Sequence, residues 1–75
     1  MGLVITYDLR APRRDYEPLY AELKRLPAWR VLESTWCYGG NMESGAMLTH
    51  LLRFMDSDDG LFITTLDNVA SHKTL

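Results

Sequence analysis

The sequence has few of the features that cross-link a protein, attach it to a membrane or direct its export. It contains one cysteine, Cys37, so no internal disulfide can form and a reducing compartment is expected. No apolar run approaches the roughly 18 residues that cross a bilayer, and no basic stretch followed by an apolar core opens the chain. We therefore expect a cytoplasmic protein without membrane attachment.

Common catalytic and cofactor motifs are also absent. The chain lacks a Walker loop, a Gly-x-Gly-x-x-Gly fingerprint and a Gly-x-Ser-x-Gly elbow, so neither a nucleotide cofactor nor acyl transfer is predicted. His50 and His72 have no cysteine or second histidine at ligand spacing, which argues against zinc. The net charge of −2 gives no overall attraction to nucleic acid, but the first thirty residues hold six basic and four acidic side chains. Any anion site is expected early in the chain.

The overall composition is that of an ordinary globular protein, in a short chain. The 75 residues are 47% hydrophobic and 24% charged, which suits one domain with one modest core. We expect this domain over residues 1–67 and a polar tail over residues 68–75.

Apolar periodicity predicts the order strand, helix, long strand, helix, strand. Residues 3–7, 29–38 and 61–66 are rich in β-branched, aromatic and other apolar side chains and are predicted strands. The first helix is expected over about residues 15–26 and the second over about 43–55. Their apolar stripes are Tyr16, Leu19, Tyr20, Leu23 and Leu26, and then Met47, Leu48, Leu51, Leu52 and Met55. Asp15 is the expected cap of the first helix, and Asn41 or Ser44 that of the second.

These elements predict an α+β fold of ferredoxin-like βαββαβ type. The long central strand would bend into two ladder segments near residues 36–40. Right-handed crossovers place both helices on one face of the antiparallel sheet. The other face would carry Val4, Thr6, and Val31 or Leu32 according to the strand register. Such a face is too apolar to remain exposed to solvent. A symmetric homodimer is therefore predicted.

Asp8 is the first candidate for chemistry, because it closes the first strand just before a basic loop, a place where ligands often bind in α/β proteins. In a dimer packed through the open sheet face, two copies of Asp8 would meet across the axis and need a proton or a cation such as Mg²⁺ between them. Alternatively, Asp8 is an ordinary turn former or cap. The residues alone leave both interpretations open.

Arg10, Arg13 and Arg14 crowd the loop around Pro12 and are candidates to hold phosphates through bidentate hydrogen bonds, with Arg30 in the same basic part of the chain. Their alternative role is to face water and pair with neighbouring acids. The aromatic residues nearby offer stacking surfaces for unpaired RNA or DNA bases, although helix stripes and strand faces normally bury such side chains.

Two segments resemble a known family. They are residues 4–9, Val-Ile-Thr-Tyr-Asp-Leu, and residues 30–36, Arg-Val-Leu-Glu-Ser-Thr-Trp. The pattern is similar to that of the small CRISPR-associated protein at the centre of the spacer-integration complex, and of its relatives, the virulence-associated protein D toxins and the short SinR-like proteins. That pattern has an aromatic-Asp-aliphatic triplet closing the first strand, an Arg-Val pair entering the second, and then Ser-aliphatic-Phe.

The resemblance implies a ferredoxin-like homodimer with Asp8 of each subunit near the axis. In this family the equivalent aspartate is linked to Mg²⁺-dependent cleavage of nucleic acid, and Tyr7 and Ser34 would support the site. Leu32 replaces a common Gln, Trp29 replaces a Gly, and a carboxyl-terminal strand is missing or very short, so the compact SinR-like group is the closer match. Two hypotheses follow: a metal-dependent endonuclease acting on RNA or DNA, and a non-catalytic binding, regulatory or scaffold dimer.

Overall fold

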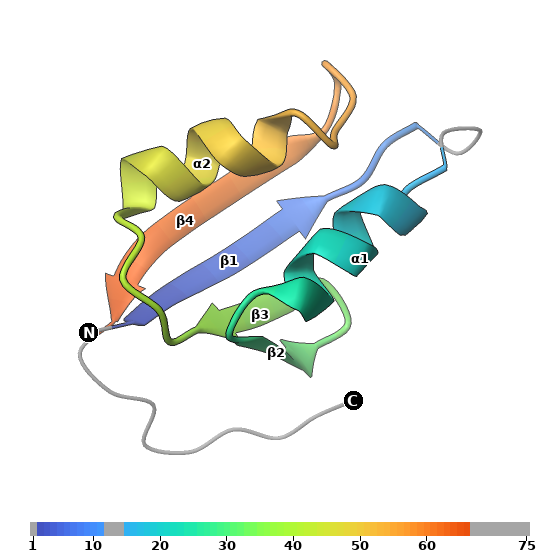
Figure 1. Cartoon of the computed structure of the whole chain (residues 1–75). Helices are drawn as coiled ribbons and strands as arrows, with labels where there is room; N and C mark the ends of the chain where they lie inside the picture. Colours follow the sequence, from blue (N-terminus) through green and yellow to red (C-terminus); the bar gives the residue numbers. More distant parts are fainter. Residues whose placement is uncertain (1, 12–14, 67–75) are drawn as a thin grey trace.

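The computed structural model describes residues 2–11 and 15–66 and has the element order βαββαβ (Figure 1). The elements are β1 (Gly2–Asp8), α1 (Glu17–Arg25), β2 (Ala28–Leu32), β3 (Thr35–Tyr38), α2 (Ser44–Leu52) and β4 (Gly60–Leu66). The strands form one antiparallel sheet in the order β2-β3-β1-β4. This is the expected ferredoxin-like topology. The predicted tail, 68–75, lies outside the described residues.

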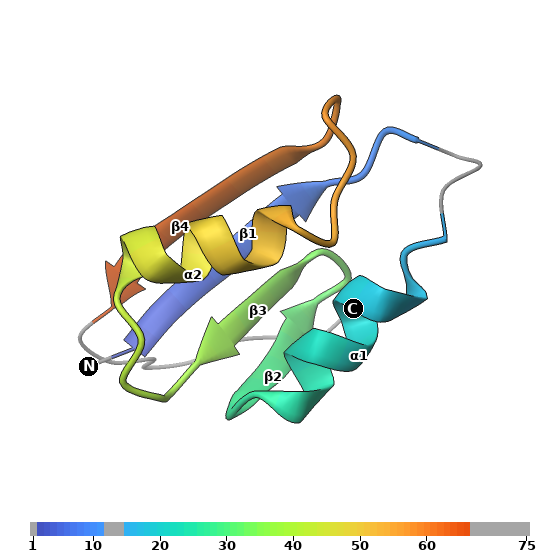
Figure 2. The same ribbon diagram turned by 45° about the horizontal axis from the view of Figure 1, so that its top comes forward.

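Both helices cover one face of the sheet, as predicted. Figures 1 and 2 show α2 along β4 and α1 along β2, which agrees with the contacts between these elements. A single apolar cluster joins the helices to the inner face of the sheet. Its buried members are Leu3, Ile5, Tyr7, Leu19, Leu23, Leu26, Trp36, Tyr38, Met47, Leu51 and Met55. Burial of these side chains supplies the main stabilisation of the domain.

The helices begin later than the sequence predicts. Helix α1 starts at Glu17 after the cap residue Tyr16, while the carboxylate of Asp15 accepts the N–H of Glu17 at 3.0 Å. Helix α2 starts at Ser44 after Glu43, and neither cap residue makes a side-chain capping bond. The cap residues are therefore Tyr16 and Glu43 and not the expected Asp15 and Asn41 or Ser44, although the Asp15 carboxylate still accepts one backbone N–H at the start of α1.

The long central strand is in fact a hairpin. Residues 33 and 34 form a turn between β2 and β3, so the predicted bend near residues 36–40 is wrong. A bulge between Arg30 and Leu32 accompanies the turn, and Leu32 pairs with Thr35. No described residue has a positive φ, so this turn does not use the glycine-rich conformation that marks most two-residue hairpins in a sequence.

The second helix has a narrower buried face than predicted. Met47 and Leu51 are fully buried, whereas Leu48 and Leu52 are 37% and 49% exposed. The prediction that all the leucines of this helix point inward is therefore wrong, because a helix of nine residues on a sheet buries only one stripe. None of the helices in the described ranges is long and apolar enough to cross a membrane.

Candidate functional site

Asp8 ends β1 on the face of the sheet that the helices leave open. Leu3, Ile5 and Tyr7 are buried under the helices, so the alternate residues Val4, Thr6 and Asp8 face the other way. The Asp8 side chain is 66% exposed. Its neighbour on β4 is Gly60, where a Cβ would lie 3.5 Å from that of Asp8. The same Cβ would lie 4.0 Å from Nη2 of Arg10, so the absence of a side chain at position 60 leaves space for the Arg10 guanidinium beside Asp8.

Arg10 forms an ion pair with Asp8, with 2.8 Å between Nε and Oδ2. The backbone N–H of Arg10 also donates to Asp59 at 2.7 Å, and Asp59 lies in the turn before β4. Because both side chains of the pair are largely exposed, the pair itself adds little stability. Its effect is to hold a guanidinium against the candidate carboxylate, with the backbone of residue 10 fixed in place.

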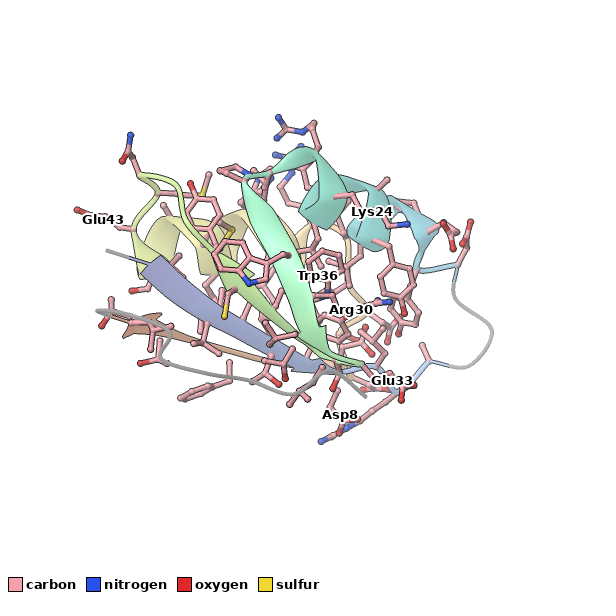
Figure 3. All side chains as sticks on the ribbon, turned by 90° about the horizontal axis from the view of Figure 1, so that it is seen from below. Asp8, Lys24, Arg30, Glu33, Trp36 and Glu43 are labelled. Carbon is pink, nitrogen blue, oxygen red and sulfur yellow. The ribbon has the colours of Figure 1, made fainter. Side chains whose placement is uncertain are left out.

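Two adjoining cavities lie at this end of the molecule and share Tyr20 and Glu33. The first has a volume of about 210 Å³ and is lined by Tyr7, Asp8, Leu9, Tyr20, Glu33 and Ser34. The second, of about 290 Å³, is lined by Glu17, Tyr20, Lys24, Arg30 and Glu33. Figure 3 shows Asp8 and Glu33 at the same end of the sheet, with Arg30 and Lys24 further towards α1. The two cavities together are therefore lined by three carboxylates, Asp8, Glu17 and Glu33, and by two cations, Lys24 and Arg30.

Arg30 lies on the helix side of the sheet. Its guanidinium carbon is 5.3 Å from the ring centroid of Tyr20 and 5.0 Å from that of Trp36. It also donates a long hydrogen bond of 3.4 Å to the hydroxyl of Tyr7. Burial raises the pKa of the Tyr20 phenol, and the Arg30 cation partly opposes this shift. Arg30 is thus a preorganised cation over aromatic rings, on the opposite face from Asp8.

Tyr7 and Ser34, the predicted supporting residues, are joined through the backbone. The Tyr7 N–H donates to the Ser34 carbonyl at 3.1 Å, which places the turn between β2 and β3 beside the end of β1. The Tyr7 ring is buried and its hydroxyl accepts a 3.0 Å hydrogen bond from Trp36 Nε1. Arg13 and Arg14 lie outside the described residues.

The described residues of one chain supply only some of the ligands that a metal ion needs. No group of three or more His, Cys, Asp and Glu side chains suited to a metal is found among residues 2–11 and 15–66. Asp8 and Glu33 line the same cavity, and Mg²⁺ often binds proteins through one or two carboxylates while it keeps several waters. The donor set therefore fits Mg²⁺ only with water or a second subunit completing it.

The open face that carries Asp8 also bears exposed apolar side chains. Phe62 on β4 is 62% exposed, and Trp29 and Leu32 on β2 are 45% and 37% exposed. Strand register places Phe62 beside Thr6, and Trp29 beside Cys37, on this same face. Cys37 itself is buried, and burial raises the pKa of its thiol, which argues against a role as a nucleophile.

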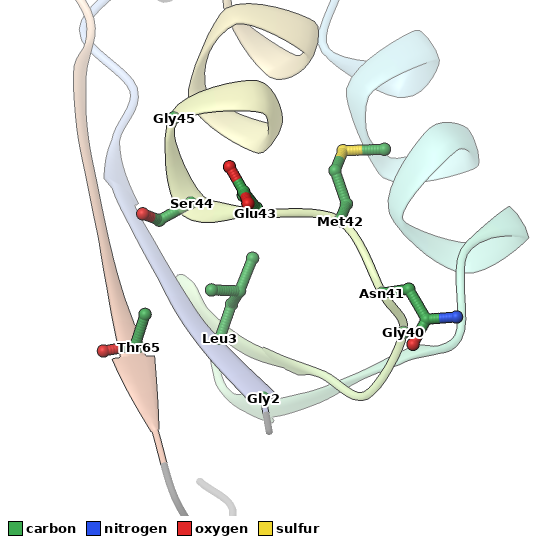
Figure 4. Close-up of a pocket in the computed structure, with 9 residues that line it drawn as sticks. All are labelled: Gly2, Leu3, Gly40, Asn41, Met42, Glu43, Ser44, Gly45 and Thr65. Atoms are coloured by element: carbon green, nitrogen blue, oxygen red, sulfur yellow. The ribbon is translucent and has the colours of Figure 1, made fainter.

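A further cavity at the opposite end of β1 offers less chemistry. It has a volume of about 380 Å³ and is lined mainly by the loop before α2, as Figure 4 shows. Glu43 is the one charged side chain among its lining residues, beside Asn41, Ser44 and several glycines. A single carboxylate without a paired base, nucleophile or cation gives no reaction class.

Sequence reasoning missed Tyr20 and Glu33 as lining residues and Asp59 as the group that holds Arg10. The role of Glu33 could not be recognised from the sequence, because it depends on the turn at residues 33 and 34, which lacks the Asn-Gly or Asp-Gly pair typical of tight hairpins. Asp59 precedes Gly60 in a stretch of turn-forming residues, and that composition does not show its contact with Arg10. No known protein-family model matches the chain.

Proposed function

We propose that this protein is a homodimer that binds RNA or DNA and cleaves its phosphodiester backbone with Mg²⁺ held by Asp8 of both subunits. The observation that carries the proposal is the position of Asp8, two-thirds exposed at the end of the central strand on an apolar sheet face. If two such faces pair about an axis near Asp8, the exposed aromatic and leucine side chains are covered and the two carboxylates come together. The likeness of residues 4–9 and 30–36 to the CRISPR-associated and virulence-associated families supports the same role.

In this proposal each residue has a defined task. Asp8 would hold the metal, which would supply an activated water and neutralise charge on the phosphate. Arg10, now paired with Asp8, would bind a phosphate oxygen with its guanidinium. Arg30 and Lys24 extend the binding surface along the adjoining cavity.

The experiment is cleavage of end-labelled single-stranded RNA and DNA with Mg²⁺ present. We expect cleavage that stops with a chelator and with Asp8→Asn. The matched control is Asp15→Asn, an exposed carboxylate near α1 that does not line the cavity and should cleave normally. Intact substrates at all conditions would reject the enzyme.

A binding dimer without catalysis is the second candidate, and the Asp8–Arg10 ion pair favours it. The guanidinium already neutralises the carboxylate, and the described residues offer no third ligand. This candidate predicts binding of RNA or DNA that weakens steeply as salt rises, with no cleavage. Affinity that stays flat between low and high salt would reject phosphate contacts in both candidates.

A further inference from the structure

The two edges of the sheet differ in how they are protected. The β2 edge carries the charged side chain of Arg30, follows Pro27 and contains a bulge, three features that discourage pairing with another strand. The β4 edge has none of them. Its seven residues, Gly60–Leu66, include no charge and no proline, and they pair with β1 along their whole length without a bulge. Among the described strands, β4 is therefore the unprotected edge.

An apolar helix stripe lies directly beside this edge. Leu48 and Leu52 are spaced i, i+4 and so share one side of α2. Leu48 contributes to a shallow groove of about 260 Å³ that is lined by Ser44, Gly45, Leu48, Leu61, Phe62 and Ile63. His50 faces away from it, since its Nε2 lies 2.6 Å from Glu22 on α1. The leucine stripe thus borders β4 and leaves two side chains partly exposed to water.

The surface formed by the β4 edge and the leucine stripe carries no formal charge. Neither β4 nor α2 contains Asp, Glu, Lys or Arg, although 24% of the chain is charged. Two identical copies can therefore approach through it without like-charge repulsion. An uncharged apolar surface that includes an open row of strand backbone groups favours association with another chain.

We propose that this surface pairs with itself in a second copy of the chain. The β4 strands run antiparallel about a two-fold axis near Ile63, which joins two sheets into one of eight strands. Centring on Ile63 sets Leu61 opposite Thr65 of the second copy, so inner-face residues meet inner-face residues. The two leucine stripes then face each other above the joined strands.

A second copy suits the surface better than an isolated peptide does. A peptide strand added to β4 would satisfy its backbone groups but would lie in the sheet layer, below α2, and would leave Leu48 and Leu52 exposed. A second copy presents an edge strand and a leucine stripe in the same relative position, so both layers are covered at once. The pairing does not depend on the proposed function, which uses the open face of the sheet instead.

The first experiment separates the two surfaces by sedimentation equilibrium. Trp29→Lys with Leu32→Lys disables the open face at the β2 side, far from β4. We expect this variant to remain a two-chain species, and the further change Leu48→Lys to give single chains. The matched control is Thr49→Lys in place of Leu48→Lys, on the adjacent exposed position of α2, and it should stay at two chains. Single chains already in the Trp29 and Leu32 variant would overturn the pairing at β4 while supporting the open-face dimer.

A second experiment covers the case in which Leu48→Lys fails to fold. Leu48→Cys places a thiol near the proposed axis, and the native Cys37 is buried, so a short bismaleimide should join two copies through position 48. Thr49→Cys is the matched control and should be joined at least tenfold less. Equal yields at the two positions would overturn the proposal. Protection of β4 amides from hydrogen exchange should rise with protein concentration, and its absence would count equally against the pairing.

Discussion

The hydroxyl of Tyr16 donates to the carboxylate of Asp59, at 2.7 Å from Oδ1 and 2.8 Å from Oδ2. The same hydroxyl accepts the N–H of Ala11 at 3.2 Å, and Asp59 accepts the N–H of Arg10 at 2.7 Å. These bonds join the segment after β1 to the turn before β4. They hold Arg10, and through it Asp8, in a defined place at the candidate site.

Tyr16→Phe should lower the free energy of unfolding by about 1–2 kcal/mol, because it removes a hydrogen bond to a charged group and leaves Asp59 less satisfied. Urea denaturation measures this change. Tyr20→Phe is the control, since the Tyr20 hydroxyl makes no hydrogen bond to another described residue. Equal losses in the two variants would contradict a specific role for the Tyr16–Asp59 pair.

Glu22 should make the stability depend on acid pH. Its pKa is lowered from 4.5 to about 2, mainly by the hydrogen bond from Arg25 and further by His50. Below pH 4.5 Glu22 is protonated in the unfolded chain but stays ionised in the folded chain. The free energy of unfolding therefore falls as the pH drops towards 2.

We expect this carboxylate to account for about 1–2 kcal/mol between pH 5 and pH 2, after allowance for solvent screening. Glu22→Gln should flatten that part of the stability curve, measured by urea denaturation at each pH. Glu17→Gln, on the exposed side of the same helix, should leave the slope intact. A wild-type slope in the Glu22 variant would refute the assignment.

Two glycines should respond oppositely to the same change. A Cβ at Gly45 in α2 meets no atom within 4 Å, and no described glycine has a positive φ. Gly45→Ala should therefore stabilise the protein by about 0.5–1 kcal/mol. A Cβ at Gly40 would overlap the phenol of Tyr38, whose buried ring cannot move away. Gly40→Ala should destabilise by about 1–3 kcal/mol. Thermal denaturation distinguishes the two, and a stabilised Gly40 variant would be the contrary result.

Tyr7→Phe should be costly because it leaves the buried N–H of Trp36 without its acceptor. The expected loss is about 1–3 kcal/mol of unfolding free energy. A double-mutant cycle with Trp36→Phe tests the cause, since the effect of Tyr7→Phe should shrink once the indole donor is gone. Strictly additive effects would show that the hydrogen bond is not responsible.

The fold was largely predictable because apolar spacing is a local property of the chain. The stripe of Leu19 and Leu23 and the apolar run of β1 each indicate their element without knowledge of the rest. The hairpin was missed because Glu33 and Ser34 carry no turn signature, and a bulge and strand pairing bend the chain there. The exposure of Leu48 and Leu52 was missed because periodicity does not show how wide a face the sheet covers.

The candidate site was predictable only in part. Asp8 at the end of the first strand and Arg10 beside it follow from order along the chain. That Arg10 pairs with Asp8, while Arg30 lies on the other face against Tyr20, follows from side-chain contacts between elements far apart in sequence.

By itself, the sequence determined the two helices, the first and last strands and their order along the chain, because each depends on neighbouring residues. Only the tertiary structure decided that Asp8 shares its face with Phe62, that Asp59 fixes the loop around Arg10, and that β4 is left as an uncharged edge beside Leu48. The physical reason is that strand order and register arise from long-range pairing, and one residue of register shift exchanges the faces of a strand.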